Sequence, residues 1–216
     1  MKNSSSLTPS NRFATQLVCA ALTALLFCLP ATLARAGDDT ALNSLLGKIT
    51  TAAESSKDST LQSLGGELAA KAKSLGASLS GNPELESQLT GALQSLLGNK
   101  GPEAVAAFQK LSAAKLTPEQ MGLAKEVGQV GSAFLVQKNL GALKGSESDV
   151  AQIVTSLREG NVTAALPAIQ KVSKNANLTP AQKDLLTSMA EKFAPGAKQA
   201  GELIGNGLKS LPGFGK

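Results

Sequence analysis

The chain has 216 residues, of which 21 are Lys or Arg and 16 are Asp or Glu, and it contains no His, Trp or Tyr. Its two cysteines, Cys19 and Cys28, both lie in the first 36 residues. The rest of the chain therefore lacks the usual ligands of zinc, copper and haem and the residues of Ser-His-Asp and Cys-His catalysis. We predict a protein that is not an enzyme and has no catalytic, metal-binding or cofactor-binding residue; its ligand-binding residues stay unassigned.

Residues 1–36 have the pattern of a secretory signal peptide. Lys2 and Arg12 supply a positive start, 14–29 is an apolar run, and Ala34-Arg35-Ala36 offers small residues at the two positions that a signal peptidase recognises. The run is about 16 residues long, short of the roughly 20 that a spanning helix needs. We predict cleavage after Ala36 and export to the periplasm or the exterior; the alternative is an uncleaved membrane anchor.

Removal of the signal peptide would bring the net charge close to zero. Without Lys2, Arg12 and Arg35 the 21 basic residues become 18, against 16 acidic ones, which leaves a net charge of +2. No block of like charge remains, and the only aromatic residues left are four of the six Phe. A nucleic-acid partner is therefore not expected.

Residues 37–81 are expected to form an N-terminal pair of helices. Asp38 or Asp39 can cap the first, and Asp58 precedes the second. In both helices the apolar residues recur at steps of three and four, which is the helical period. These residues are Leu42, Leu45, Leu46, Ile49 and Ala53 in the first helix, and Leu61, Leu64, Leu68, Ala72, Leu75 and Leu79 in the second.

Beyond residue 81 the pattern predicts six more helices in two sets of three, and a last helix near 197–210. The sets are 83–97, 102–115 and 118–143 within repeat one (82–145), and 147–158, 162–175 and 180–194 within repeat two (146–210), before a tail at 211–216. Pro167 falls inside one pattern and predicts a kink or a late start there. No long stretch alternates with period two. The predicted fold class is all-α: one multi-helix bundle domain, 37–216, without a β-sheet.

Two pentapeptides, Leu116–Gln120 and Leu178–Gln182, carry helix-start signals. Each has Thr at the N-cap position, Pro at the first helical position and Gln three residues after the Thr. Thr can accept from a backbone N–H that has no partner within the helix, and Gln can reach back to the N-cap N–H. Pro loses nothing at a position where its N–H would be unpaired. Both segments therefore predict capping boxes.

The residues upstream of each pentapeptide recur in the same order. A shift of 61 aligns 86–112 with 147–173 and gives nine identities in 27 positions without a gap. One inserted residue moves the shift to 62 for the pentapeptides. The sequence therefore predicts an internal duplication of about 61 residues, with only two units, rather than a solenoid of shorter repeats.

All 21 glycines lie after residue 36, and Gly91, Gly122, Gly128 and Gly131 fall inside predicted helices. Each costs roughly 1 kcal/mol relative to Ala in an exposed helix interior, a cost that close approach of two helices can offset. The Gly141/Gly145 and Gly201/Gly205 spacings match the close-packing motif of membrane helices. Neither lies in a 20-residue apolar segment, so small-residue packing in a soluble bundle is expected.

Three small groups of residues have spacings that some enzymes use. Ser112 and Lys115 match the Ser-x-x-Lys spacing of penicillin-binding enzymes, but the Ser-Asp-Asn and Lys-Thr-Gly elements of those enzymes are absent. The carboxylate pairs Glu84/Glu86 and Glu147/Asp149 are two residues apart and do not face each other on a helix. Both pairs fall in predicted first turns, where negative charge favours the helix dipole.

With their Leu-Thr-x-x-Gln pattern, the segments Leu116–Gln120 and Leu178–Gln182 resemble the paired motifs of the Spy/CpxP group of bacterial periplasmic proteins. The resemblance covers these ten residues, and the group is otherwise charge-rich, Met-rich and Gly-poor. It implies a small, all-helical, stress-linked protein of the periplasm. Members act without ATP as chaperones or sensors and bind clients on a helical cradle.

The leading hypothesis is a non-catalytic binding, scaffold or chaperone-like protein of the bacterial cell envelope. It would hold a protein partner or client in an apolar groove between helices, at the place where the repeats meet. The alternative is a membrane-surface protein whose amphipathic helices, above all 61–79 with Lys71 and Lys73, bind peripherally. A hydrolase is the third and least favoured reading.

Overall fold

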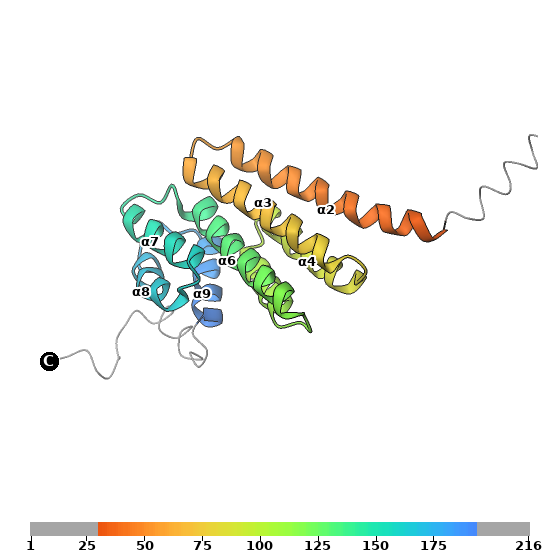
Figure 1. Ribbon diagram of the computed structural model, residues 1–216. Helices are drawn as coiled ribbons and strands as arrows, with labels where there is room; N and C mark the ends of the chain where they lie inside the picture. Colours follow the sequence, from red (N-terminus) through yellow and green to blue (C-terminus); the bar gives the residue numbers. More distant parts are fainter. Residues whose placement is uncertain (1–29, 194–216) are drawn as a thin grey trace, which may run out of the picture. The chain divides into compact units, whose positions relative to one another are not determined.

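The computed structural model describes the backbone of residues 30–193 and the side chains of residues 40–193 (Figure 1). This part of the chain forms eight α-helices and no β-strand, so the predicted all-α multi-helix bundle is confirmed. The helix predicted near 197–210 lies outside the described residues. The helices are α2 (Pro30–Glu54), α3 (Ser59–Leu79), α4 (Pro83–Leu97), α5 (Gly101–Ser112), α6 (Pro118–Leu140), α7 (Glu147–Arg158), α8 (Val162–Val172) and α9 (Pro180–Phe193).

The chain divides into two compact units, Met1–Thr40 and Ala41–Lys216, and α2 runs through the boundary. The start expected at Asp38 or Asp39 is wrong, because α2 already begins at Pro30. Pro is well tolerated at a first helical position, and the Ala residues that follow it favour a helix. The signal peptide and its cleavage after Ala36 stay predictions. In the described part, no helix is both long enough and apolar enough to cross a membrane.

The predicted caps of α3 and α4 are confirmed by their hydrogen bonds, whereas α5 and α7 begin without a side-chain cap. Asp58 accepts from the backbone N–H of Thr60 and of Leu61, and Asn82 accepts from that of Leu85, with Pro83 at the start of α4. The ends agree less well, since α5, α6 and α8 each stop three residues before the predicted end. In α6 the residue that follows the last turn is Gly141. The late start expected at Pro167 is wrong, because α8 begins at Val162 and contains the proline.

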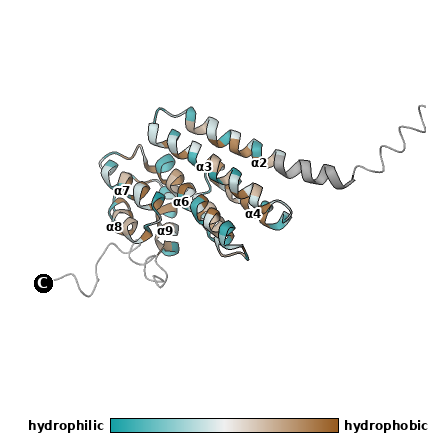
Figure 2. Ribbon diagram, in the orientation of Figure 1, coloured by the Kyte–Doolittle hydropathy of each residue, from teal (hydrophilic) through white to brown (hydrophobic). Residues whose placement is uncertain are grey.

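Helix α6 lies at the centre of the unit that contains it. It packs against α3, α5 and α7, and its exposed residues lie in its first half, between 118 and 126 (Figure 1). Seven consecutive residues, 130–136, are all buried, so this stretch is enclosed on every side rather than along one stripe. Apolar and hydrophilic residues are interspersed along the coloured parts of the labelled helices (Figure 2). Burial of α6 therefore depends on its neighbours and not on an unusually apolar sequence.

The N-terminal helical pair packs through small residues. At Gly65 of α3 an added Cβ would collide with the Cβ of Ala53 in α2 and would lie 3.5 Å from Cε2 of Phe134 in α6. Ile49, Ala53 and Phe134 are at most 1% exposed. Glycine at position 65 therefore permits the close approach of α2 and α3 beside the central helix.

The turn between α4 and α5 recurs between α7 and α8 at a spacing of 61 residues. Each turn has one residue with positive φ, Asn99 (56°) in the first and Gly160 (74°) in the second. Each is then closed by a backbone hydrogen bond of the same type: Lys100 N–H to Ser95 O at 3.0 Å, and Asn161 N–H to Ser156 O at 2.8 Å. In both bonds the N–H lies five positions after the carbonyl, which is a common hydrogen-bond pattern at the C-terminus of a helix. The internal duplication itself stays a prediction.

Candidate ligand-binding pocket

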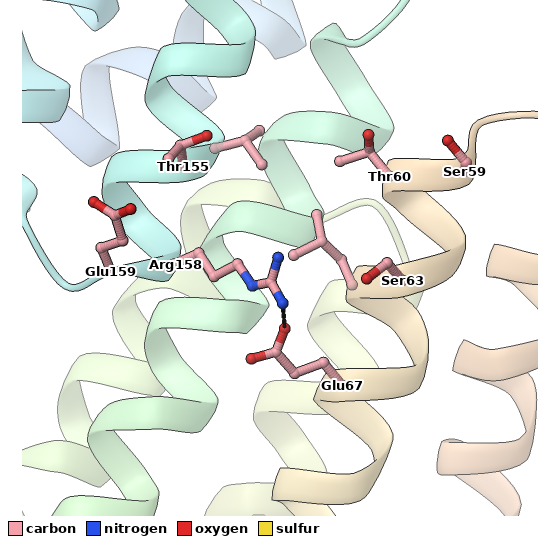
Figure 3. Close-up of a pocket in the computed structure, with 9 residues that line it drawn as sticks. Ser59, Thr60, Ser63, Glu67, Thr155, Arg158 and Glu159 are labelled. Atoms are coloured by element: carbon pink, nitrogen blue, oxygen red, sulfur yellow. Dashed lines mark ion pairs between the residues drawn. The ribbon is translucent and has the colours of Figure 1, made fainter.

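Two cavities of different character lie beside the central helix. The larger, about 600 Å³, is a polar groove between α3 and α7. Arg158 reaches across it from α7 and pairs with Glu67 of α3, with 2.8 Å between Nη2 and Oε2 (Figure 3). The other labelled residues around it are Ser59, Thr60, Ser63, Thr155 and Glu159.

The Arg158–Glu67 ion pair accounts for the polar groove without a ligand. The guanidinium and the carboxylate neutralise each other, and the pair joins two helices that both pack on α6. Half of the Arg158 side chain is exposed, so water screens the interaction and its contribution to stability is small. Because its main charges are already compensated, this groove is not our candidate site.

The smaller cavity is an open apolar pocket of about 290 Å³ lined by residues of five helices. Its volume is at the lower end of the roughly 300–1,000 Å³ typical of small-molecule sites. Its walls come from α5 and α6 on one side and from the end of α7, the following turn, α8 and α9 on the other. The lining residues are Val105, Phe108, Gln109, Ser112, Lys125, Gly128, Gln129, Ser132, Leu157, Gly160, Val162 and Phe193.

Two glycines shape this pocket. At Gly128 of α6 an added Cβ would lie 3.6 Å from the Cβ of Phe108 and 3.9 Å from the Oγ of Ser112, so a methyl group would make ordinary contacts there. Gly160 has φ of +74°, which favours glycine, and the side chain of Gln129 lies against it. A longer side chain at position 128 would enter the pocket.

The polar groups of the pocket divide into satisfied and unsatisfied ones. Ser112 Oγ donates to the carbonyl of Phe108 at 2.9 Å, and Gln109 Nε2 donates to the carbonyl of Lys192 at 3.2 Å. Ser132 is 4% exposed, and its hydroxyl makes no hydrogen bond within the described part of the chain. Its oxygen is not among the fully buried atoms that lack a partner in the described residues, so solvent in the pocket can reach it. Ser132 therefore marks a position at which a bound molecule could supply the missing partner.

The Ser112/Lys115 spacing does not form a catalytic pair. Helix α5 ends at Ser112, so Lys115 lies in the bend that follows and not one helical turn away on the same helix. The Ser112 hydroxyl is occupied by the carbonyl of Phe108. Ser112 contributes instead to the wall of the apolar pocket.

The carboxylates Glu84 and Glu86 lie in the first turn of α4, as predicted. Glu84 Oε1 accepts from Gln88 Nε2 at 3.3 Å, and Glu86 Oε1 accepts from the backbone N–H of Gly81 at 3.1 Å. Each carboxylate thus interacts with its own helix start and not with the other one. The arrangement stabilises the beginning of α4.

The second carboxylate pair, Glu147 and Asp149, lies in the first turn of α7. Backbone N–H groups, first that of Glu147 itself and then that of Gly145, lower the pKa of the Glu147 carboxyl below its usual value. Asp149 Oδ1 lies 3.4 Å from Lys171 Nζ in α8. Both carboxylates therefore have structural partners, and within the described residues no group of three potential metal-binding side chains occurs.

The glycines singled out in the sequence have different roles. Of the four glycines that were predicted to lie inside helices, Gly131 alone mediates a close approach of two helices, since an added Cβ would lie 2.6 Å from Cε2 of Phe108 in α5. Gly91 and Gly122 have no such neighbour within 4 Å, so close packing does not explain them. Gly141 follows the end of α6, and the Gly141/Gly145 spacing is therefore not a helix-packing motif. Gly201/Gly205 lies outside the described residues.

Both predicted capping boxes are present, and each makes one further bond that the sequence pattern did not indicate. Besides capping α6, Gln120 Nε2 donates to the carbonyl of Ser78, near the end of α3, at 2.6 Å. Besides capping α9, Gln182 Nε2 donates to the carbonyl of Asn139, near the end of α6, also at 2.6 Å. Each glutamine therefore joins the start of its own helix to the end of another.

Because Lys138 is partly buried, we expect the stability difference between the wild type and Lys138→Met to depend on pH. It lies in the last turn of α6, where the dipole favours a cation, yet burial lowers its pKa below 10.5, so the burial effect is the larger. The protonated form is penalised in the folded state, and this penalty is present at neutral pH and disappears as pH rises through the lowered pKa towards 10.5. Lys138→Met should therefore raise the free energy of unfolding by about 0.5 kcal/mol at pH 7.

Urea denaturation of both proteins at pH 7 and above pH 10.5 tests this expectation. The advantage of Lys138→Met should shrink at the higher pH, where the wild-type lysine is neutral in both states. Comparison of the two proteins at each pH removes the effect of the other lysines. An advantage that stays constant across this range would show that lost packing strain, and not charge burial, is responsible.

Comparisons of the chain with known proteins identified no relative. No family model, no curated protein and no solved structure matches it. The assignment of a function therefore rests on the pocket and on the sequence.

Proposed function

We propose that this chain is an exported, non-catalytic binding protein of the bacterial cell envelope, and that the apolar pocket between α5, α6, α8 and α9 is its binding site. The observation that carries the proposal is a cavity of about 290 Å³ with an apolar lining, into which Ser132 brings a hydroxyl that makes no hydrogen bond within the described residues. Sites for small molecules typically combine an apolar wall with a few polar groups. The signal-like residues 1–36 support export.

The location of the pocket supports a binding role. One wall comes from 105–132, in predicted repeat one, and the other comes from 157–193, in predicted repeat two. We propose that the two halves arose by internal duplication, which the matching turns at Asn99 and Gly160 and the matching bonds of Gln120 and Gln182 support. Duplicated halves meet along a new seam, and cavities commonly lie between packed helices.

A chaperone of the Spy/CpxP type remains a proposal of lower rank. Its support is limited to the two pentapeptides. Gln120 and Gln182 cap helices and join helix ends, which is a structural use of both motifs. In the apolar pocket, by contrast, the side chains of Lys125 and Ser132 make no hydrogen bond within the described residues.

The membrane-surface alternative has less support than the binding role. Its best candidate was the helix at 61–79, which is almost all of α3. The apolar face of α3 is part of the core, with Leu64, Leu68 and Leu75 at most 1% exposed. In the folded protein this face is not available to a lipid surface.

A neutral fluorescent probe tests the proposed binding site. N-phenyl-1-naphthylamine should gain fluorescence when it is added to the purified protein, because the pocket would shield it from water. Gly128→Leu should weaken this binding at least about tenfold, since the leucine side chain would fill the space beside Phe108. Fluorescence titration of both proteins gives the two dissociation constants.

Gly122→Leu is the matched control. It makes the same change in the same helix, at a position with open space and away from the pocket. Helical circular dichroism and the thermal midpoint show that both variants fold. Equal probe binding by Gly128→Leu and the wild type would reject this pocket as the site.

A further inference from the structure

We propose that the apolar pocket binds a small amphipathic carboxylate, such as a medium-chain fatty acid, with the carboxylate at Lys125 and the hydrocarbon chain among the apolar walls. This inference rests on the proposed function and adds the chemical class of the ligand. It is carried by three features of the pocket: one cation at the rim, an apolar interior, and an unpaired hydroxyl further along the same helix.

The first feature is the charge of the lining. Lys125 is the one charged side chain among the residues that line the pocket in the described part of the chain. It is exposed, and no carboxylate of the described residues pairs with it. The neighbouring Glu126 forms an ion pair with Lys71, with 2.9 Å between Oε2 and Nζ. An anionic group at the rim would therefore meet an uncompensated ammonium group, and charge-assisted hydrogen bonds are the stronger kind.

The second feature is the shape and chemistry of the interior. Phe108 and Leu157 are at most 2% exposed, and Gly128 adds no side chain to the wall that α6 contributes. A volume of about 290 Å³ is too small for a large lipid, but it is suitable for a single short hydrocarbon chain. Burial of that chain would supply the non-directional part of the affinity.

The third feature is the position of Ser132. Lys125 and Ser132 are seven residues apart on α6, two turns along one face, which corresponds to roughly 10 Å. Gly128 lies between them on this face and leaves room for the chain of the ligand. Ser132 lines the pocket and its hydroxyl has no hydrogen-bond partner within the described residues, so it can pair with a second oxygen of the ligand. A hydroxylated fatty acid could pair its carboxylate with Lys125 and its hydroxyl with Ser132.

A series of eight-carbon probes tests the charge preference. We expect octanoate to displace the neutral fluorescent probe at a concentration at least about tenfold lower than octylamine, with octanol between them. Lys125→Gln should remove this order, and Lys183→Gln, at an exposed lysine outside the pocket, should leave it unchanged. The apolar walls are the same in all three proteins, so only the charge at the rim differs.

The role of Ser132 is tested with 8-hydroxyoctanoate. In the wild type it should bind about fivefold more tightly than octanoate, because its hydroxyl pairs with that of Ser132. Ser132→Ala should remove this difference and leave octanoate binding unchanged. If Ser132→Ala lowered the affinity for octanoate and for 8-hydroxyoctanoate equally, Ser132 would have a structural role, and this part of the inference would be overturned.

The outcomes separate the ligand class from the proposed function. If the neutral fluorescent probe binds and Gly128→Leu blocks it, while octanoate, octanol and octylamine compete equally, the pocket is confirmed and the carboxylate is rejected. If none of the probes binds the purified protein, both proposals are rejected. Octanoate binding that Gly128→Leu does not change would place the ligand elsewhere and overturn the inference.

Discussion

Replacement of Gly131 by Ala should lower the free energy of unfolding by about 1–2 kcal/mol. The added Cβ would lie 2.6 Å from Cε2 and 2.7 Å from Cζ of Phe108, a residue that is 2% exposed and packs in the core beside the apolar pocket. Overpacking of this kind costs about 1–3 kcal/mol. The gain in helix propensity from Gly to Ala is at most about 1 kcal/mol, so the steric effect wins.

The same substitution elsewhere in α6 provides the control. Gly122 has no such neighbour within 4 Å, so Gly122→Ala should raise the free energy of unfolding by about 0.5–1 kcal/mol. Gly128→Ala makes only an ordinary contact with Phe108 and should be neutral or stabilising. Urea denaturation of the three variants measures these differences. If Gly131→Ala were as stable as Gly122→Ala, α5 and α6 would not approach each other as described.

A substitution of Phe108 tests whether the steric strain of Gly131→Ala arises at the Phe108 ring. Phe108→Leu removes part of the ring that the new methyl group would meet. In the Phe108→Leu background, Gly131→Ala should therefore be less destabilising than in the wild type. An unchanged effect would place the strain away from Phe108.

Gln120→Ala and Gln182→Ala should each lower the free energy of unfolding by about 2 kcal/mol. Each substitution removes half of a capping box and the donor to a carbonyl at another helix end, Ser78 O in one case and Asn139 O in the other. Loss of a cap typically costs about 1 kcal/mol, and loss of a net hydrogen bond costs a similar amount. Because the two glutamines make the same bonds, the two losses should be similar.

Substitution by Glu separates the two contributions. A glutamate at position 120 can still accept from the Thr117 N–H, but it has no amide to donate to Ser78 O. Gln120→Glu should therefore destabilise by about half as much as Gln120→Ala. Gln170→Ala, at a helical glutamine that has no hydrogen bond from its side chain within the described residues, should stay within about 0.5 kcal/mol of the wild type. Equal losses in all three variants would mean that the joining bonds contribute nothing specific.

The helices and their starts were predictable because they depend on neighbours in the chain. A cap such as Asp58 or Thr117 bonds to a backbone N–H two or three residues away. The 3-4 spacing of apolar residues along α3 likewise reports which face will be buried, whatever covers it. Helix ends were less predictable. Helices α5 and α8 end at Ser112 and Val172, each three residues before the end that the apolar pattern predicted.

The candidate site was not predictable in the same way. Apolar residues such as Phe108 and Leu157 are 49 positions apart, and no local pattern indicates that they face one cavity. Ser132 looks like an ordinary helix residue until its burial and its lack of a partner are seen. The helical glycines were a weak signal, because their spacing did not distinguish Gly128 and Gly131, which face α5, from Gly122, which faces open space.

By itself the sequence determined that this chain is helical, where most of its helices begin, and which reactive residue types it lacks after residue 36. These properties follow from interactions over a few residues and from composition. The tertiary structure alone decided that α6 is the enclosed central helix, that Gln120 and Gln182 join helix ends, and that Lys125, Gly128 and Ser132 share a pocket with α8 and α9. The physical reason is that burial and cavity shape arise from contacts between segments far apart in the chain, which local periodicity does not encode.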